Sequence, residues 1–426
     1  IHSEIQNAIA AHNQSTKKAS LIITDGTIIS DKYAAIYWPA NGDVEISGGM
    51  IQGCTAMEAK AGNVNITGGT FTGTMTDPNF VDKKPESGTA SAEGSALNLV
   101  TGMYTPGLVA NITGGSFYSE ANKGIRVYNV GSDKGSEAEI NIGYMYNIGA
   151  PEGQISIEYA DNADFSKSVI NLSNKDEVVL PEGFYLTRSE SSVSDMYPYK
   201  VIALGENVAF VTKDGVETLY TSLAEAIENA GMEYDATVTL LQDVTIDTTL
   251  NITQNLTLDL NNKNLTANLT GSKDYAIITD NEAVVTVKNG SIYSDKRGVI
   301  AKSGRLVLEN LDLSAVRYAL YAGGSSDVTI DQDSLVTSTE YVGVAVWGAV
   351  DEATQTVQSP TLNVYGTVKS NNLYAIAGNG TDKSYTNINI YESANIESDS
   401  VAIYHPQQGN LNIQGGKVVG ATAIAM

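Results

Sequence analysis

The stretch VEISGGMI at Val44–Ile51 recurs as VNITGGTF at Val64–Phe71 and as ANITGGSF at Ala110–Phe117. Each copy alternates apolar and polar residues, which is the period of a strand with one buried face. The Gly-Gly pair that follows suits a corner where the backbone is crowded or left-handed. Looser copies of the same phrase begin at Val285, Leu306, Val328, Leu362, Ile388 and Leu411.

A second short apolar strand precedes the first in most copies. Its members are Ala35–Tyr37, Ala319–Tyr321, Ala345–Trp347, Ala375–Ala377 and Ala402–Tyr404. Several strands and no helix in a period of about 20–30 residues are typical of a solenoid whose coils stack in parallel. We therefore predict an all-β solenoid whose coils bury inward Val, Ile and Leu against each other. An all-β sandwich is the alternative, but the Asn-Gly and Asp-Gly hairpin loops that it needs are mostly missing.

One stretch breaks this pattern and predicts an amphipathic helix over residues 219–230. Its apolar face consists of Leu223, Ala226, Ile227 and Ala230. Ser222 and Glu225 form a capping box, and Gly231 supplies the stop. We expect the helix to cover the open strand edge at the start of a solenoid, because such an edge otherwise invites aggregation.

The helix also marks a domain boundary near residue 205. Residues 1–205 are predicted to be the C-terminal part of one solenoid module, ending in an irregular closing segment. Residues 206–426 are predicted to be the N-terminal part of a second module. Residues 375–426 align without a gap with residues 8–59, which predicts that the chain begins and ends within a module.

Composition excludes several classes of function. The formal net charge is −24, from 25 basic and 49 acidic residues, and such a chain repels nucleic acid and anionic membrane surfaces. Cys54 is the only cysteine, so we expect a small buried side chain without a disulfide partner. No apolar run predicts membrane insertion. We predict no metal site and no cofactor; calcium stays open, although the nonapeptide of calcium β-rolls is absent.

The coils resemble the pectin-lyase-like family of right-handed parallel β-helices. The stretch LYTSLAEAI at Leu219–Ile227, followed by VTLLQDV at Val238–Val244, resembles a motif of large bacterial cell-surface repeat proteins. In those proteins a Tyr-Thr/Ser-Leu-x-Glu-Ala-Ile helix precedes a Leu-Leu-x-Asp strand that opens a β-helix. The resemblance implies a right-handed parallel β-helix in an extracellular or bacterial cell-surface protein. It fixes no activity, because the fold carries lyases, hydrolases, adhesins and inert stalks.

The sequence contains no repeated pattern of catalytic residues. Hydrolases of this fold pair carboxylates on neighbouring coils, and the candidates are Asp259, Asp280, Asp331 and Asp333. No pair of them recurs at matched positions. Aligning the second strand of three coils instead places Asp274, Arg297 and Arg317 in one charged ladder, which suits either a uronate site or a solvated row of charges.

Aromatic residues give a more regular pattern. Tyr37, Tyr321, Trp347 and Tyr404 each follow an inward aliphatic residue, so they are predicted to share one exposed rung, with Trp38 beside it. Exposed aromatic rows stack on sugar rings or on a partner protein; shielding by a loop is the alternative. We expect a non-catalytic, adhesin-like surface module that contacts polysaccharides or surface glycans, and as the alternative a polysaccharide lyase or glycoside hydrolase.

Overall fold

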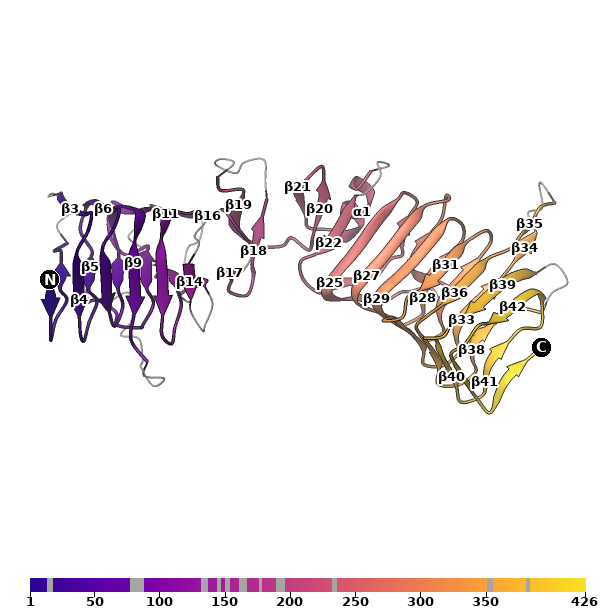
Figure 1. Cartoon of the computed structure of the whole chain (residues 1–426). Coiled ribbons are helices and arrows are strands. Elements are labelled where there is room, and N and C mark those ends of the chain that lie inside the picture. Colours follow the sequence, from indigo (N-terminus) through magenta and orange to yellow (C-terminus); the bar gives the residue numbers. More distant parts are fainter. Residues whose placement is uncertain are drawn as a thin grey trace. The chain divides into compact units, whose positions relative to one another are not determined.

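A computed structural model describes residues 1–13, 18–76, 88–131, 137–143, 147–149, 154–160, 167–175, 178–188, 196–231, 236–350, 355–380 and 384–426. The described chain consists almost entirely of β-strands in mostly parallel sheets, with one α-helix (Figure 1). Its contacts divide it into two compact units, Ile1–Gly205 and Glu206–Met426, which we call unit 1 and unit 2.

Unit 1 contains two sheets within its described residues. The twelve-stranded sheet comprises β1 (His2–Ser3), β3 (Ala19–Ile23), β4 (Thr27–Ser30), β6 (Gly42–Ile46), β7 (Met50–Gly53), β9 (Gly62–Gly73), β11 (Gly107–Ser119), β13 (Glu137–Ile142), β14 (Asn147–Gly149), β16 (Ser168–Leu172), β18 (Phe184–Thr187) and β19 (Tyr199–Ala203). The seven-stranded sheet comprises β2 (Ile9–Ala10), β5 (Ile36–Trp38), β8 (Met57–Ala59), β10 (Leu97–Thr101), β12 (Ile125–Asn129), β15 (Ile155–Tyr159) and β17 (Val178–Val179). Pairing is parallel until β19, which joins β16 and β18 antiparallel.

Unit 2 repeats this arrangement. Its fifteen-stranded sheet comprises β20 (Ala209–Lys213), β21 (Val216–Tyr220), β22 (Thr237–Leu240), β23 (Val244–Ile246), β25 (Leu256–Ala267), β27 (Val284–Ser294), β29 (Arg305–Ala315), β31 (Asp327–Ile330), β32 (Leu335–Ser338), β36 (Thr361–Val364), β37 (Thr367–Ser370), β39 (Tyr385–Ile390), β40 (Asn395–Ser398), β42 (Gln408–Ile413) and β43 (Lys417–Val419). Its eight-stranded sheet comprises β24 (Leu250–Ile252), β26 (Tyr275–Thr279), β28 (Arg297–Ala301), β30 (Tyr318–Gly323), β33 (Val342–Trp347), β38 (Tyr374–Ala377), β41 (Val401–Tyr404) and β44 (Thr422–Ala425). A small hairpin joins β34 (Ala349–Val350) to β35 (Val357–Gln358).

The strand register follows the repeated phrase. Val44 pairs with Val64, and Val64 pairs with Ala110, so the first residues of the three clearest copies lie side by side. The looser copies do the same in unit 2, in the unbroken series Val285, Leu306, Val328, Leu362, Ile388 and Leu411. The predicted parallel stacking of these strands is therefore confirmed.

The two glycines of the phrase have different roles. The second glycine has a positive φ, +89° at Gly49 and +96° at Gly69, which a residue with a side chain rarely adopts. At the first glycine the neighbouring strand passes too close for a side chain: a Cβ on Gly48 would lie 2.3 Å from the carbonyl oxygen of Thr24. The glycine pair thus permits both the corner and the close stacking of successive corners.

Each unit has its own hydrophobic core between its sheets. In unit 1 the inward residues of the phrase, such as Val64, Ile66 and Phe71, are fully buried, and Phe71 stacks on Phe117 at 4.9 Å. In unit 2 an unbroken set of aliphatic residues runs from α1 to Ile403. Cys54 is free and buried, as expected.

The helix α1 (Leu223–Asn229) begins four residues later than the sequence predicted. Leu219 and Tyr220 belong instead to β21, which pairs with β20 as an antiparallel hairpin. The helix cannot begin earlier because Ser222 has extended backbone angles and caps it, its hydroxyl accepting the amide hydrogen of Glu225 at 3.4 Å.

Two elements share the closing role that we expected of the helix alone. Strand β20 pairs antiparallel with β22, so the β20–β21 hairpin covers the edge of the parallel strands and β21 becomes the outermost strand of the fifteen-stranded sheet. The helix covers the core beside β24, where Leu223, Ala226 and Ile227 are buried. The end of the stack in unit 2 therefore has both its backbone edge and its apolar interior covered.

We expect Ile227→Asp to destabilise unit 2 by about 3–5 kcal/mol, because an unpaired carboxylate would enter the apolar end of the core. Chemical denaturation followed by circular dichroism measures the loss, and light scattering detects aggregation. Ala224→Asp is the matched control, because Ala224 is exposed on the same helix. Equal stability of the two variants would show that α1 does not close the core.

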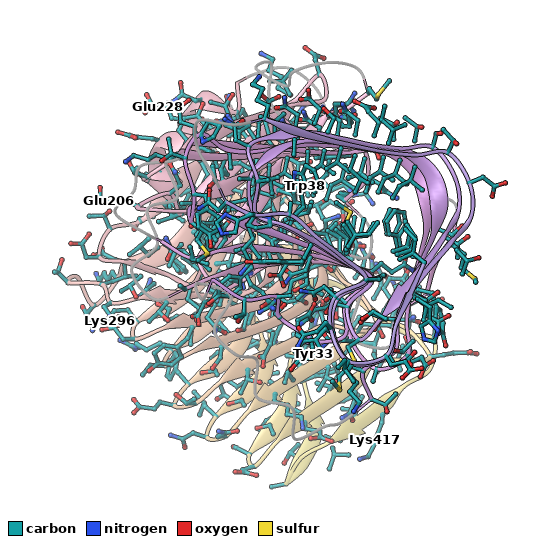
Figure 2. All side chains as sticks on the ribbon, turned by 90° about the vertical axis from the view of Figure 1, so that its left-hand side faces the viewer. Tyr33, Trp38, Glu206, Glu228, Lys296 and Lys417 are labelled. Carbon is teal, nitrogen blue, oxygen red and sulfur yellow. The ribbon has the colours of Figure 1, made fainter. Side chains whose placement is uncertain are left out.

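His405 is an unusual residue in the core of unit 2. It occupies the position that matches Trp38 in the aligned stretches Ala35–Pro39 and Ala402–Pro406. Both side chains are 3% exposed, and Figure 2 shows Trp38 inside unit 1. The His405 Nε2 lies 3.4 Å from the hydroxyl of Thr386, and no described residue bonds its Nδ1. Burial lowers the pKa of His405.

A lowered pKa in the folded state predicts that unit 2 loses stability on acidification. The neutral ring is favoured in the fold, so the stability that it provides is complete above the ordinary histidine pKa and falls as the pH drops below it. Between about pH 7.5 and about pH 5, the free energy of unfolding should fall more for the wild type than for His405→Gln. Parallel pH profiles for the two proteins would contradict this reading.

Candidate functional site

The outer surface of the eight-stranded sheet of unit 2 carries a row of aromatic side chains. Leu320 and Ile403 belong to the core, so the adjacent Tyr321 and Tyr404 point away from it. Together with neighbours on adjacent strands they form a hydrophobic cluster of their own. We call this surface the aromatic face; it comprises Tyr275, Tyr318, Tyr321, Tyr341, Trp347, Tyr374 and Tyr404.

Ring contacts hold the aromatic face together. The ring centroid of Trp347 lies 5.3 Å from that of Tyr321 and 6.0 Å from that of Tyr318, with interplanar angles of 70° and 79°. Tyr374 stacks on Tyr404 at 4.9 Å. Because the rings pack on one another, Tyr321, Trp347 and Tyr404 are half-buried and not fully exposed as expected. A ligand would therefore meet rings that are already ordered.

Trp347 does not lie on the rung that the sequence predicted. Tyr321 pairs with Ala345, and Trp347 lies two residues further along, opposite Gly323. Alternation keeps Trp347 on the same outer surface, since a shift of two residues preserves the side that a side chain faces. The Tyr321 ring can lie over Gly323, and so approach Trp347, because Gly323 has no side chain: a Cβ there would lie 2.4 Å from the Tyr321 ring.

Two arginines lie on rings of the aromatic face. The Arg297 guanidinium carbon is 5.2 Å from the centre of the Tyr275 ring and 5.1 Å from that of Tyr318. The Arg317 guanidinium carbon is 5.1 Å from the Tyr341 ring centre. Such cation–π contacts stabilise by about 0.5–1 kcal/mol at exposed sites and by more where water is excluded.

The predicted charged ladder is wrong in its register. Arg297 pairs with Tyr275, one residue after Asp274, and Val299 is the inward residue that pairs with Ile277. The error arose because Val299 and Ile300 are both aliphatic, so alternation alone did not show which one faces inward. The Asp274 carboxylate instead accepts the amide hydrogen of Gly271 at 2.8 Å, as part of a turn.

Tyr37 and Trp38 are not exposed, contrary to expectation. Trp38 is 3% exposed and belongs to the core of unit 1. Tyr37 is 6% exposed: it faces outward from β5, but residues 88–96, which we call the strap, cover it. Its hydroxyl donates to the carbonyl oxygen of Gly88 at 3.0 Å. The loop-shielded alternative therefore describes this part of unit 1.

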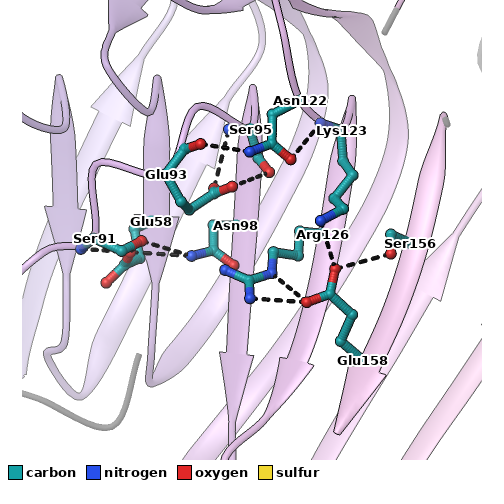
Figure 3. A network of polar contacts seen from close by, with 10 residues as sticks. All are labelled: Glu58, Ser91, Glu93, Ser95, Asn98, Asn122, Lys123, Arg126, Ser156 and Glu158. Atoms are coloured by element: carbon teal, nitrogen blue, oxygen red, sulfur yellow. Dashed lines mark hydrogen bonds and ion pairs between the residues drawn. The ribbon is translucent and has the colours of Figure 1, made fainter. Parts of the chain in front are cut away.

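A buried polar network fixes the strap to the outer surface of β8 and β10. Glu58 and Lys60 form an ion pair at 3.0 Å, and neither side chain is exposed. Lys60 also donates to the carbonyl oxygen of Thr89 at 3.2 Å. The other carboxylate oxygen of Glu58 accepts from the Ser91 amide at 2.9 Å and from the Asn98 amide group at 3.1 Å (Figure 3). Burial raises the pKa of Glu58 despite the neighbouring Lys60.

A second set of polar contacts lies at β12 and β15. Glu158 accepts from the Arg126 Nε at 2.9 Å and pairs with Lys123 at 3.0 Å (Figure 3). The repeat pattern did not predict these buried polar contacts. The stretch MEAK at Met57–Lys60, where two charged residues alternate with apolar ones in a strand, was a signal for them, but the strap that buries these charges is remote in sequence.

Breaking the buried ion pair on one side should destabilise unit 1. We expect Lys60→Met to cost about 3–5 kcal/mol, because the Glu58 carboxylate would lose its buried counter-charge. The double variant Glu58→Gln/Lys60→Met should be less destabilised than the sum of the two single variants. Denaturant titrations of all four proteins measure this coupling, and purely additive losses would mean that the pair is not coupled.

The four candidate catalytic carboxylates accept hydrogen bonds from neighbouring groups, and Asp259 and Asp280 also pair with Lys288 and Lys302. Asp259 accepts from the Asn261 amide at 2.9 Å, and Asp331 accepts from the Ser334 hydroxyl at 2.6 Å. Asp280 accepts from the Ser303 hydroxyl at 3.0 Å. Asp333 accepts only from the side chain of its neighbour Gln332 among the described residues, at 3.5 Å. Within the described ranges, no three His, Cys, Asp or Glu side chains gather as metal ligands.

Comparisons with protein-family models and with curated proteins identify no relative for this chain. No sequence model of a protein family matches it, and no curated protein matches it significantly. In the part of the chain that the structure describes, no helix has the length and apolar character needed to cross a membrane. The aromatic face is therefore the feature of this chain that bears on its function.

Proposed function

We propose that this chain is part of a right-handed parallel β-helix of the pectin-lyase-like kind, displayed on a bacterial surface or secreted, and that it binds glycans without transforming them. The coil-to-coil register of the Gly-Gly phrase and the helix-then-strand motif support the fold. The strongly acidic composition is compatible with an extracellular protein that stays soluble.

The main evidence for glycan binding is the aromatic face. Its rings point outward from a rigid sheet, and Tyr321, Trp347 and Tyr404 retain exposed surface. Ordered rings that present part of their surface to water suit the apolar faces of sugar rings. Because the row spans several strands, one extended glycan chain can contact several rings at once.

Each contact in such a row is weak. An aromatic contact stabilises by about 0.5–1.5 kcal/mol beyond the area that it buries. Useful affinity then comes from several rings on one chain, or from several copies of the module on one cell surface. This is the behaviour of an adhesin-like scaffold, which needs many reversible contacts.

Replacing Trp347 and Tyr321 together with alanine should weaken glycan binding about tenfold or more, since two adjacent stacking surfaces are lost. Binding is measured by a polysaccharide panel followed by isothermal titration with the best ligand. The loss of stability should be modest, because these rings lie outside the core.

The matched control removes two aromatic rings elsewhere in unit 2. Tyr365 and Tyr391 stack at 4.0 Å beyond the ends of β36 and β39, away from the aromatic face, so Tyr365→Ala/Tyr391→Ala should bind as the wild type does. Binding that is equal in both double variants would remove the aromatic face as the site. Release of unsaturated products or reducing ends from any polysaccharide would instead favour a lyase or a hydrolase.

A further inference from the structure

A buried group of three polar residues in unit 2 has the parts needed to form a covalent bond. Thr386 lies in β39, His405 follows β41, and Gln407 precedes β42. We propose that the Thr386 hydroxyl attacks the Gln407 side-chain amide, with His405 as the base, and forms an ester that cross-links neighbouring coils. This modification does not depend on glycan binding.

The three side chains contact one another inside the fold. Their exposed fractions are 0% for Thr386, 3% for His405 and 8% for Gln407. The Thr386 Oγ1 accepts a hydrogen from the Gln407 Nε2 at 2.9 Å and lies 3.4 Å from the His405 Nε2. The hydroxyl is thus held against both a base and an amide, whose carbon is one bond from the contacting nitrogen.

The Gln407 amide is held in place by bare backbone. A Cβ on Gly378 would overlap this amide group, so the two lie in direct contact only because residue 378 is glycine. The Gln407 Oε1 and the His405 Nδ1 are buried, and no described group forms a hydrogen bond with either. Buried polar atoms without partners cost free energy. Hydrogen bonding within the cluster therefore does not by itself explain why these residues are there.

Unit 1 shows that the fold does not require polar residues at these positions. In the gap-free alignment of residues 375–426 with residues 8–59, the three counterparts are Ala19, Trp38 and Ala40. The backbone pairing is equivalent, because Ala19 pairs with Gly42 as Thr386 pairs with Gly409. An apolar set thus occupies the same place in unit 1. The combination of hydroxyl, imidazole and amide distinguishes this coil of unit 2 from its counterpart.

The reaction balances without an outside reactant. The His405 Nε2 takes the hydroxyl proton of Thr386 while Oγ1 forms a bond to the Gln407 Cδ. The Cδ–Nε2 bond of Gln407 then breaks, and His405 returns the proton to the departing nitrogen, which leaves as ammonia. Burial lowers the pKa of His405, so the ring is the neutral base at physiological pH. The reaction occurs once per chain, so it needs no rapid turnover.

The intact mass of the purified wild-type chain tests the cross-link. We expect a mass below the sequence mass by one ammonia, about 17 Da. After denaturation and cleavage at Glu392 and Glu397, the peptides that contain Thr386 and Gln407 should stay joined until hydroxylamine cleaves the ester. Thr386→Val, Gln407→Leu and His405→Gln should each have the full mass, whereas Thr386→Ser keeps the hydroxyl and should still lose ammonia.

Thr361→Val is the matched control, because Thr361 lies on the neighbouring strand β36 and pairs with Asn387; it should keep the mass loss. A wild-type mass equal to the sequence mass overturns the inference. A mass loss that persists in Thr386→Val also overturns it, because ring closure at an Asn-Gly pair such as Asn289–Gly290 releases ammonia too. No glycan takes part in these measurements, so either result leaves the proposed function to its own test.

Discussion

Parallel backbone pairing between successive strands is the constraint on which the rest of this molecule depends. It places Val44 beside Val64 and Val64 beside Ala110, although Ala110 is remote in sequence. Strands in such a stack lie about 4.8 Å apart, so any side chain at a corner must fit under the next corner. Gly48 satisfies this requirement because the Thr24 carbonyl leaves no room for a Cβ.

The same constraint creates surfaces that no single segment contains. Residues at equivalent positions form columns that run across the strands, and each column is either core or surface because neighbouring side chains alternate. In unit 2 one inward column consists of Val299, Leu320 and Val344. At the first residues of the same strands, Arg297 lies between the rings of Tyr275 and Tyr318, an arrangement that depends on three separate strands being in register.

The smaller sheet of each unit uses its outer surface differently. In unit 1 the strap covers this surface, and the Glu58–Lys60 ion pair beneath it is inaccessible to water. Buried charges cost free energy unless they are paired and hydrogen-bonded, and here backbone groups of the strap complete the hydrogen bonding. In unit 2 the same kind of surface carries aromatic rings that remain half-exposed. One architecture thus presents a closed polar surface in unit 1 and a partly open aromatic surface in unit 2.

The sequence by itself determined the strand class, the parallel register of the Gly-Gly phrase and the buried face of α1. It did so because these depend on local alternation and on glycine, and Gly49 shows the expected positive φ. Only the tertiary structure decided which outward aromatic residues stay accessible. Tyr37 and Tyr404 follow the same Ala-Ile pair, yet the remote strap buries Tyr37 and not Tyr404. The position of Arg297 likewise depends on whether Val299 or Ile300 faces inward. Packing against the neighbouring strands decides this, and the local pattern does not.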